Sequence, residues 1–170
     1  MTLNKDQLRK RIEEENLISN FVDLDKQLQP AGFDVTAAEI HRFKESGSLD
    51  FSNSEREIPE TEEVETVKRA EEDEYGWWEL EQGAYKVVMN EKVDIPENLT
   101  GYAFPRSSLL RMGCTIDNAV WDAGYTGTGS FLLIVDNSEG VEIKENARVN
   151  QLVFERIDST EGYTGKYNEE

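Results

Sequence analysis

The spacing of apolar residues predicts one helix at the start of the chain. Within residues 4–19, Leu8 and Ile12 lie four positions apart, and charged residues surround them. This spacing is typical of the buried face of an amphipathic helix, and Leu17 is expected to extend that face. Asn4 or Asp6 is expected to cap the helix at its start.

After this helix the apolar pattern predicts strands. Residues 33–40 suggest a short strand and a turn, and Pro96 predicts a turn at residues 95–99. Short runs rich in Val, Ile, Leu, Phe and Tyr, bounded by Gly, Pro, Asp or Asn, are typical of strands. They occur at residues 84–93, 102–104, 131–135, 141–143 and 151–154. Many short strands with regularly spaced turns predict an all-β fold, built as a sandwich, jelly roll or barrel.

The chain length fits one domain, residues 1–170, large enough to bury a core. No internal repeat or long Gly/Ser linker divides it. Residues 46–75 are polar and acidic, and two interpretations remain open for them. They form either a mobile flap or a hairpin pair with an acidic outer face.

The charge balance limits the partners. The chain has 36 Asp and Glu residues against 18 Lys and Arg residues, a net charge of −18. Nonspecific nucleic-acid binding needs a basic face, so it is not expected, whereas a few well-placed cations suffice for a free nucleotide. The acidity reflects either ordinary solvated surfaces or, the interpretation we favour, a cytosol of high salt that screens self-repulsion.

Other features of the composition exclude several classes of protein. No apolar run reaches membrane length, and no secretory segment follows Met1. The single cysteine, Cys114, excludes an internal disulfide and favours a reducing, cytoplasmic location. With His41 as the only histidine, the chain cannot build a His/Cys/Cys zinc site, which excludes a zinc-dependent base deaminase.

Two neighbouring segments carry the candidate chemistry. Arg106, Ser107, Ser108 and Arg111 lie within six residues, and guanidinium and hydroxyl groups suit phosphate oxygens. Asp122 follows shortly afterwards, and a carboxylate can activate water for attack on a phosphate. A triphosphate site with its own base is therefore the first hypothesis, and the alternative is a surface loop followed by an ordinary turn.

Four blocks in sequence order resemble the superfamily of dUTPases and dCTP deaminases, in particular archaeal dUTPases of the dCTP-deaminase-like branch. The blocks are residues 29–35, 105–113, 119–127 and 146–154. The resemblance implies a distorted β jelly roll, a homotrimer with sites between subunits, and a bound deoxynucleoside triphosphate with Mg²⁺.

The resemblance also separates the two activities of the superfamily. Deaminases carry a catalytic Glu in an Ile-Thr-Leu-Glu pattern on the strand after the nucleoside block, and residues 129–135 contain no Glu. Asp122 matches the water-activating base of dUTPases. Hydrolysis of dUTP to dUMP and pyrophosphate is therefore expected. A dCTP deaminase, a bifunctional enzyme and a non-catalytic trimeric nucleotide-binding regulator remain as alternatives.

The resemblance assigns further roles around the triphosphate. Arg106, Ser107, Ser108 and Arg111 are expected to hold phosphate oxygens, and Gln151 offers an amide donor and acceptor.

Other residues are assigned to the nucleoside, the metal ion and the tail. Tyr125 is expected under the deoxyribose, and Asp34 is expected to contact Mg²⁺ through water. Backbone groups of the 115–125 hairpin are expected to read the uracil. The tail, residues 160–170, resembles that of the deaminase branch and lacks the Gly-rich motif with Arg and Phe of most dUTPases. Within it, Tyr163, Lys166 and Tyr167 are candidates to cover the substrate, with Lys166 reaching the γ-phosphate.

Overall fold

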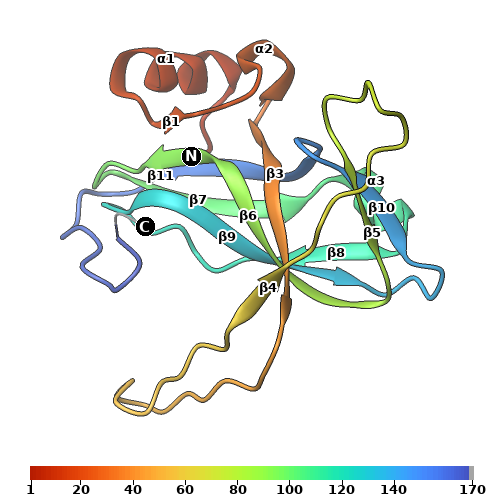
Figure 1. The fold of residues 1–170 in the computed structure, drawn as a ribbon. Coiled ribbons are helices and arrows are strands. Elements are labelled where there is room, and N and C mark those ends of the chain that lie inside the picture. Colours follow the sequence, from red (N-terminus) through yellow and green to blue (C-terminus); the bar gives the residue numbers. More distant parts are fainter. Residues whose placement is uncertain (169–170) are drawn as a thin grey trace.

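Strands dominate the computed structural model of the protein, which describes residues 1–168 (Figure 1). The all-β prediction is confirmed. The predicted domain and tail also include residues 169 and 170, which lie outside the described residues. The strands are β1 (Ile18–Ser19), β2 (Leu28–Gln29), β3 (Gly32–Phe43), β4 (Thr61–Glu63), β5 (Trp77–Leu80), β6 (Gly83–Asp94), β7 (Leu99–Pro105), β8 (Cys114–Asp117), β9 (Thr126–Val135), β10 (Val141–Lys144) and β11 (Arg148–Arg156). The helices are α1 (Lys5–Glu15), α2 (Leu24–Gln27) and α3 (Ser107–Arg111).

The main sheet curls into a nearly closed barrel. Its strands follow the order β7-β11-β3-β6-β9-β8, and neighbouring strands are antiparallel. The two ends of this order meet, because the Asn118 side chain donates to the Ala103 carbonyl at 3.1 Å and Gly101 forms a backbone bridge with Trp121. The chain between β8 and β9 is therefore fixed against β7.

The barrel core follows from the alternation of side chains along the strands. On β9, Phe131, Leu133 and Val135 point inward and are buried, while the residues between them are more exposed. Successive side chains of a strand point to opposite faces, so the intervening residues form the outer surface of the barrel. That outer surface carries the cavity described below.

Helix α1 covers one end of the barrel (Figure 1). Asn4 caps it through a capping box with Gln7, as one of the two predicted caps, and Leu8 and Ile12 are buried. The helix ends at Glu15, earlier than predicted, because Asn16 adopts a left-handed conformation with φ of 55°. None of the helices in residues 1–168 combines the length and apolar character needed to cross a bilayer.

The largest difference from the predicted elements is β3. The sequence suggests a short strand and a turn, whereas β3 is one strand of 12 residues. It pairs with β2 and β11 over its first half and with β6 and β4 over its second half. Residues 32–37 are all buried, so the sequence lacks the polar–apolar alternation by which strands are recognised. The short strands β1, β2 and β5 were also not predicted.

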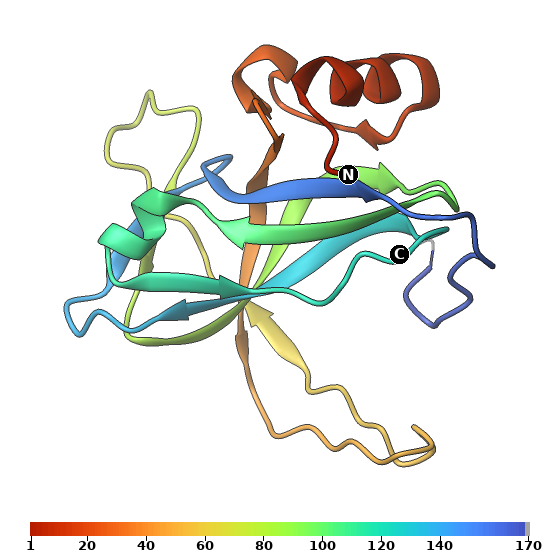
Figure 2. The ribbon, with the colours of Figure 1, turned by 180° about the vertical axis from the view of Figure 1, so that it is seen from behind.

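Residues 44–60 form an arm that projects from the barrel (Figures 1 and 2). Ser48 and Glu57 exchange two backbone hydrogen bonds of 3.0 Å, which supports the hairpin interpretation for this part of the acidic segment. At the tip, the Asp50 carboxylate accepts hydrogen bonds from Ser52 and from the Glu55 amide. These bonds lower the pKa of Asp50 to about 2.

Candidate active site

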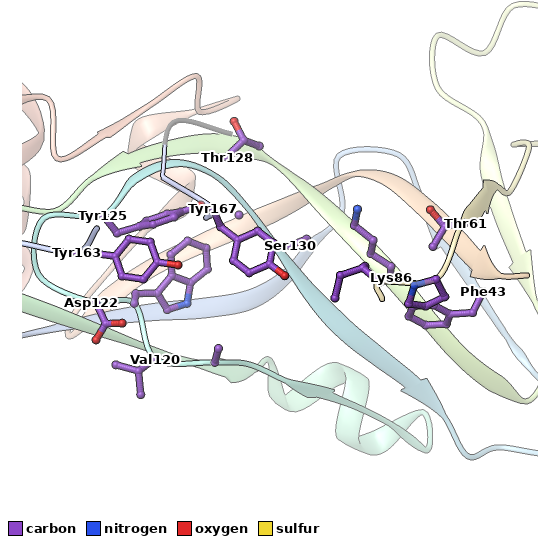
Figure 3. A pocket seen from close by; sticks show the side chains of 15 residues that line it. Phe43, Thr61, Lys86, Val120, Asp122, Tyr125, Thr128, Ser130, Tyr163 and Tyr167 are labelled. Carbon is purple, nitrogen blue, oxygen red and sulfur yellow. The ribbon is translucent and has the colours of Figure 1, made fainter. Parts of the chain in front are cut away.

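A cavity of about 530 Å³ lies on the outer surface of the barrel (Figure 3). Its floor includes Thr128 and Ser130 of β9, and its walls come from the loop between β8 and β9, the base of the arm and the C-terminal tail. The volume is within the range of small-molecule sites.

Trp121 fixes the loop that carries Asp122. The indole is buried, and the Trp121 backbone exchanges hydrogen bonds of 2.8 and 3.0 Å with Gly101. A Cβ added to Gly129 would lie 1.7 Å from the ring atom Cη2 of Trp121, so only glycine leaves room for the indole. This packing positions the next residue, Asp122, in the cavity wall.

The Asp122 carboxylate is exposed to the cavity. Within residues 1–168 its oxygens make no hydrogen bond or ion pair with another side chain or backbone group. A carboxylate in this situation is able to bind and activate a water molecule.

Aromatic rings connect this loop to the tail. Tyr125 lies edge-on to Trp121, with ring centroids 5.6 Å apart, and edge-on to Tyr163 at 5.9 Å. Tyr163 and Tyr167 both line the cavity. Lys166 does not line it, and its Nζ lies 5.9 Å from the centre of the Tyr167 ring.

Hydrogen bonds also connect the tail to the backbone of this loop. The Tyr163 amide donates to the Ala123 carbonyl at 2.7 Å, and the Thr126 amide donates to the Asn168 side chain at 2.9 Å. Gly124 has φ of 79°, and a Cβ there would lie 2.5 Å from the Cα of Gly162. A glycine at residue 124 therefore permits both the turn and the close approach of the tail.

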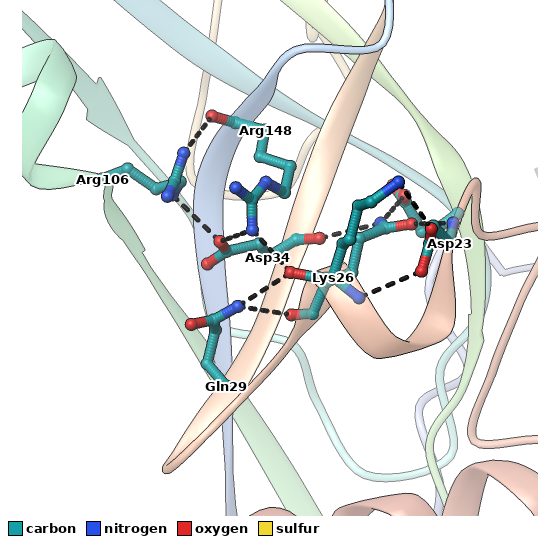
Figure 4. A network of polar contacts seen from close by, with 8 residues as sticks. Asp23, Lys26, Gln29, Asp34, Arg106 and Arg148 are labelled. Atoms are coloured by element: carbon teal, nitrogen blue, oxygen red, sulfur yellow. Dashed lines mark hydrogen bonds and ion pairs between the residues drawn. The ribbon is translucent and has the colours of Figure 1, made fainter.

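A second cluster surrounds Asp34 (Figure 4). Its Oδ2 atom lies 3.0 Å from Nε of Arg106 and 3.4 Å from Nη1 of Arg148, and Arg106 also donates to the Arg148 carbonyl at 3.2 Å. The Asp34 side chain is only 2% exposed. Burial raises the pKa of its carboxyl group, and the two guanidinium groups oppose that rise.

The other predicted phosphate residues lie near this cluster. Ser107, Ser108 and Arg111 are exposed on α3, and Arg111 donates to the Ser107 carbonyl at 3.2 Å. Gln151 is paired across the sheet with Asp34 on one side and with Phe104 on the other.

One chain therefore keeps the two predicted halves of the site apart. Asp122 follows Trp121, whose backbone is hydrogen-bonded to Gly101 of β7. Arg106 lies five residues beyond Gly101, just after the end of β7. At the rise of an extended strand, the backbone positions of Gly101 and Arg106 are roughly 16 Å apart. Asp122, Tyr125, Tyr163 and Tyr167 line the cavity, whereas Arg106, Ser107, Ser108, Arg111, Gln151 and Asp34 do not.

Two charged residues in these regions were missed by the sequence analysis. Arg148 lies inside the recognised block 146–154, so its basic side chain was a usable signal. Lys86 lines the cavity from β6, and no motif marks it, because its place follows from the pairing of β6 with β9.

The described residues of one chain hold no cluster of metal-ligating side chains. Residues 1–168 contain no group of three or more His, Cys, Asp and Glu side chains placed to hold a metal ion. Oδ2 of Asp34 is held by two guanidinium groups. The contact of Asp34 with Mg²⁺ through water stays a prediction.

The barrel defines the structural class of the protein. The crystal structure of 2′-deoxycytidine 5′-triphosphate deaminase from Agrobacterium tumefaciens matches it with a TM-score of 0.66 and 23% sequence identity. The match covers 92% of this chain and 48% of that protein, so this chain spans about half its length. This likeness shows a shared fold.

Sequence comparison identifies the family. A model of the dCTP deaminase-like family matches residues 2–157. Two similar relatives, from Methanosarcina acetivorans and Archaeoglobus fulgidus, are each named "Probable deoxyuridine 5′-triphosphate nucleotidohydrolase". They are 44% and 43% identical to this chain, and each match covers 99% of it and 96% of the relative. The chain belongs to the dCTP deaminase-like family, which confirms the resemblance seen in its motifs.

Proposed function

We propose that the protein is a dUTP diphosphohydrolase that converts dUTP to dUMP and pyrophosphate. The observation that carries this proposal is the distribution of carboxylates around the cavity. Asp122 is exposed in its wall, while Thr128 and Ser130, the outward residues of β9 in the floor, are not acidic. The cavity thus offers a carboxylate that can act as a base toward water. It lacks a carboxylate on β9 that could transfer protons at the pyrimidine ring. The names of the two archaeal relatives support the same activity.

The proposed chemistry is water attack on the α-phosphorus. Asp122 accepts a proton as the water oxygen bonds to phosphorus, and the bond from phosphorus to the oxygen bridging the α- and β-phosphates breaks. Pyrophosphate leaves with that electron pair, and Asp122 later releases the proton to solvent. Arg106, Ser107, Ser108 and Arg111 hold the phosphate oxygens and stabilise the developing charge, and Gln151 contributes its amide.

The separation of the two halves supports a homotrimer with shared sites. In this arrangement the cluster around Arg106 of one subunit faces the cavity of its neighbour, so each site combines two chains. The surface beside the cluster suits such a contact, since Phe104 and Leu110 are each more than half exposed. Exposed apolar groups of this kind mark interaction surfaces when they lie together.

The tail has a place in this proposal. Tyr163 and Tyr167 cover the nucleotide and exclude water, and Lys166 reaches the γ-phosphate. Tyr125 lies under the deoxyribose. Mg²⁺ is expected to accompany the triphosphate, since this ion is usually bound by one or two carboxylates together with substrate phosphates.

The test is to incubate the protein separately with dUTP, dCTP, dTTP and UTP in the presence of Mg²⁺, and to follow pyrophosphate and ammonia. We expect pyrophosphate from dUTP and no ammonia from dCTP. Ammonia release would establish deamination instead. Binding of dUTP without turnover would identify a non-catalytic regulator.

A further inference from the structure

Lys86 is the one basic side chain among the described residues that line the cavity, and Asp122 is the one acidic side chain. Figure 3 shows the two at opposite ends of the cavity. Within residues 1–168 the Lys86 ammonium group makes no hydrogen bond or ion pair. A half-buried cation without a partner in a cavity wall suits an acceptor atom of a ligand.

The register of the sheet explains this position. Lys86 of β6 lies directly opposite Leu132 of β9, and Leu132 lies opposite Asp117 of β8. Directly opposite residues of antiparallel strands place their side chains on the same face. Lys86, Asp117 and Leu132 also line a smaller cavity of about 250 Å³ that continues from the first. Lys86 is therefore shared by both cavities.

The orientation of the proposed substrate follows from the end of the cavity that carries Asp122. Asp122 acts at the α-phosphorus, and Tyr125 lies under the deoxyribose. Leu132, the cross-strand partner of Lys86, is four residues beyond Thr128 on the same strand, which is roughly 13 Å along the strand. In this orientation the pyrimidine points away from Asp122 and toward Lys86 and Phe43, which Figure 3 shows in the other part of the cavity.

We infer that the Nζ atom of Lys86 donates a hydrogen bond to O4 of the uracil ring and thereby selects uracil over cytosine. This inference rests on the proposed function. A lysine ammonium group has three donors and no acceptor. Position 4 of uracil is a carbonyl acceptor, whereas position 4 of cytosine is an amino donor. Cytosine would place two donors against each other and leave both unpaired, which is how a polar site rejects an analogue.

The experiment replaces the donor while keeping the length of the side chain. Lys86→Met should lower kcat/KM for dUTP hydrolysis by about 10- to 100-fold, the range for a hydrogen bond from a charged donor. The affinity for dUMP relative to dCMP, measured by calorimetry, should fall by a similar factor. Lys86→Arg keeps donors and should retain part of the preference. Lys68→Met, at an exposed position that lines neither cavity, is the matched control and should change neither value.

Two results would overturn the inference. If Lys86→Met weakens dUMP and dCMP equally, Lys86 contacts the phosphate or the sugar instead of position 4. If the dUMP-to-dCMP ratio stays at the wild-type value with no loss of affinity, Lys86 contacts neither. Failure of the wild type to hydrolyse dUTP would refute the proposed function, while the comparison of the two monophosphates still tests Lys86.

Discussion

Asp122 and Asp34 are the same residue type in two opposite settings. Asp122 is exposed in a cavity between aromatic side chains, without a charged partner among residues 1–168. Asp34 is buried, and one of its oxygens holds both Arg106 and Arg148. An exposed carboxylate without a partner is able to exchange protons with water, whereas a buried carboxylate between two guanidinium groups orients those groups instead.

Each of the two regions lacks what the other one has. The cavity has a base and a place for a nucleoside, but Lys86 is its one basic lining residue among those described. The cluster has arginines and serines, and none of them lines the cavity. In the proposed trimer, the cavity of one subunit faces the cluster of its neighbour. Each site then has a base and a place for a nucleoside from one chain, and arginines and serines from the other.

We expect substitution of the exposed carboxylate to reduce activity the most. Asp122→Asn keeps the size of the side chain and removes the proton acceptor, so kcat for dUTP should fall by roughly 10²–10⁴. Binding of dUMP should remain close to wild type, as measured by calorimetry. A kcat near the wild-type value would show that Asp122 is not the base.

Mixing inactive subunits tests whether the two regions act across chains. Asp122→Asn and Arg106→Ala should each be inactive as homotrimers. The two variants are mixed in equal amounts, unfolded and refolded together. Half of the subunits then carry an intact cavity and the other half carry an intact cluster. A given site combines an intact cavity with an intact neighbouring cluster with probability one half times one half. About a quarter of wild-type activity should therefore return. No recovery, in mixtures that sedimentation shows to be assembled, would place both regions of a site in one chain.

Removal of residues 160–170 tests the cover over the cavity. Tyr163 packs on Tyr125 from this segment, and no strand of the barrel is included in it. Turnover of dUTP should fall about 10- to 100-fold, because water exclusion and orientation of the substrate are lost. Circular dichroism and sedimentation should show an unchanged fold and assembly. Full activity in the shortened protein would remove the tail from the site.

The buried carboxylate should matter more for stability than the exposed one. Asp34→Asn leaves Arg106 and Arg148 without their anion. Loss of one partner from a buried pair costs about 3–5 kcal/mol. Both arginine side chains are about one-third exposed, so we expect roughly 2–3 kcal/mol in urea unfolding. Asp136→Asn, at an exposed position, is the control and should change stability little. An equal loss in both variants would contradict the structural role of Asp34.

The concentration of salt should change the stability only slightly. The net charge of −18 leaves exposed acids repelling one another at low ionic strength. The melting temperature should therefore rise by a few degrees between low and molar KCl. Because buried pairs are screened less than exposed ones, the loss caused by Asp34→Asn should persist at high salt. A flat or falling melting temperature would show that the acidity is no adaptation to salt.

Short-range sequence patterns specify the local features of this protein. Asn4 and the Leu8–Ile12 spacing specified the first helix, and runs of apolar residues marked the central part of most long strands. Arg106 and Asp122 were recognised because their chemistry is carried by short contiguous blocks. Such features depend on neighbours within a few residues, and these neighbours are visible in the sequence.

Contacts between residues that are distant in sequence depend on the three-dimensional packing of the chain. Asp34 and Arg148 are 114 residues apart, and the position of Lys86 opposite Leu132 depends on the register of β6 and β9. The separation of Arg106 from Asp122 follows from the direction of β7, although the two residues are close in sequence. Strand register is set by the packing of a whole face of the sheet, so no short stretch of sequence specifies it.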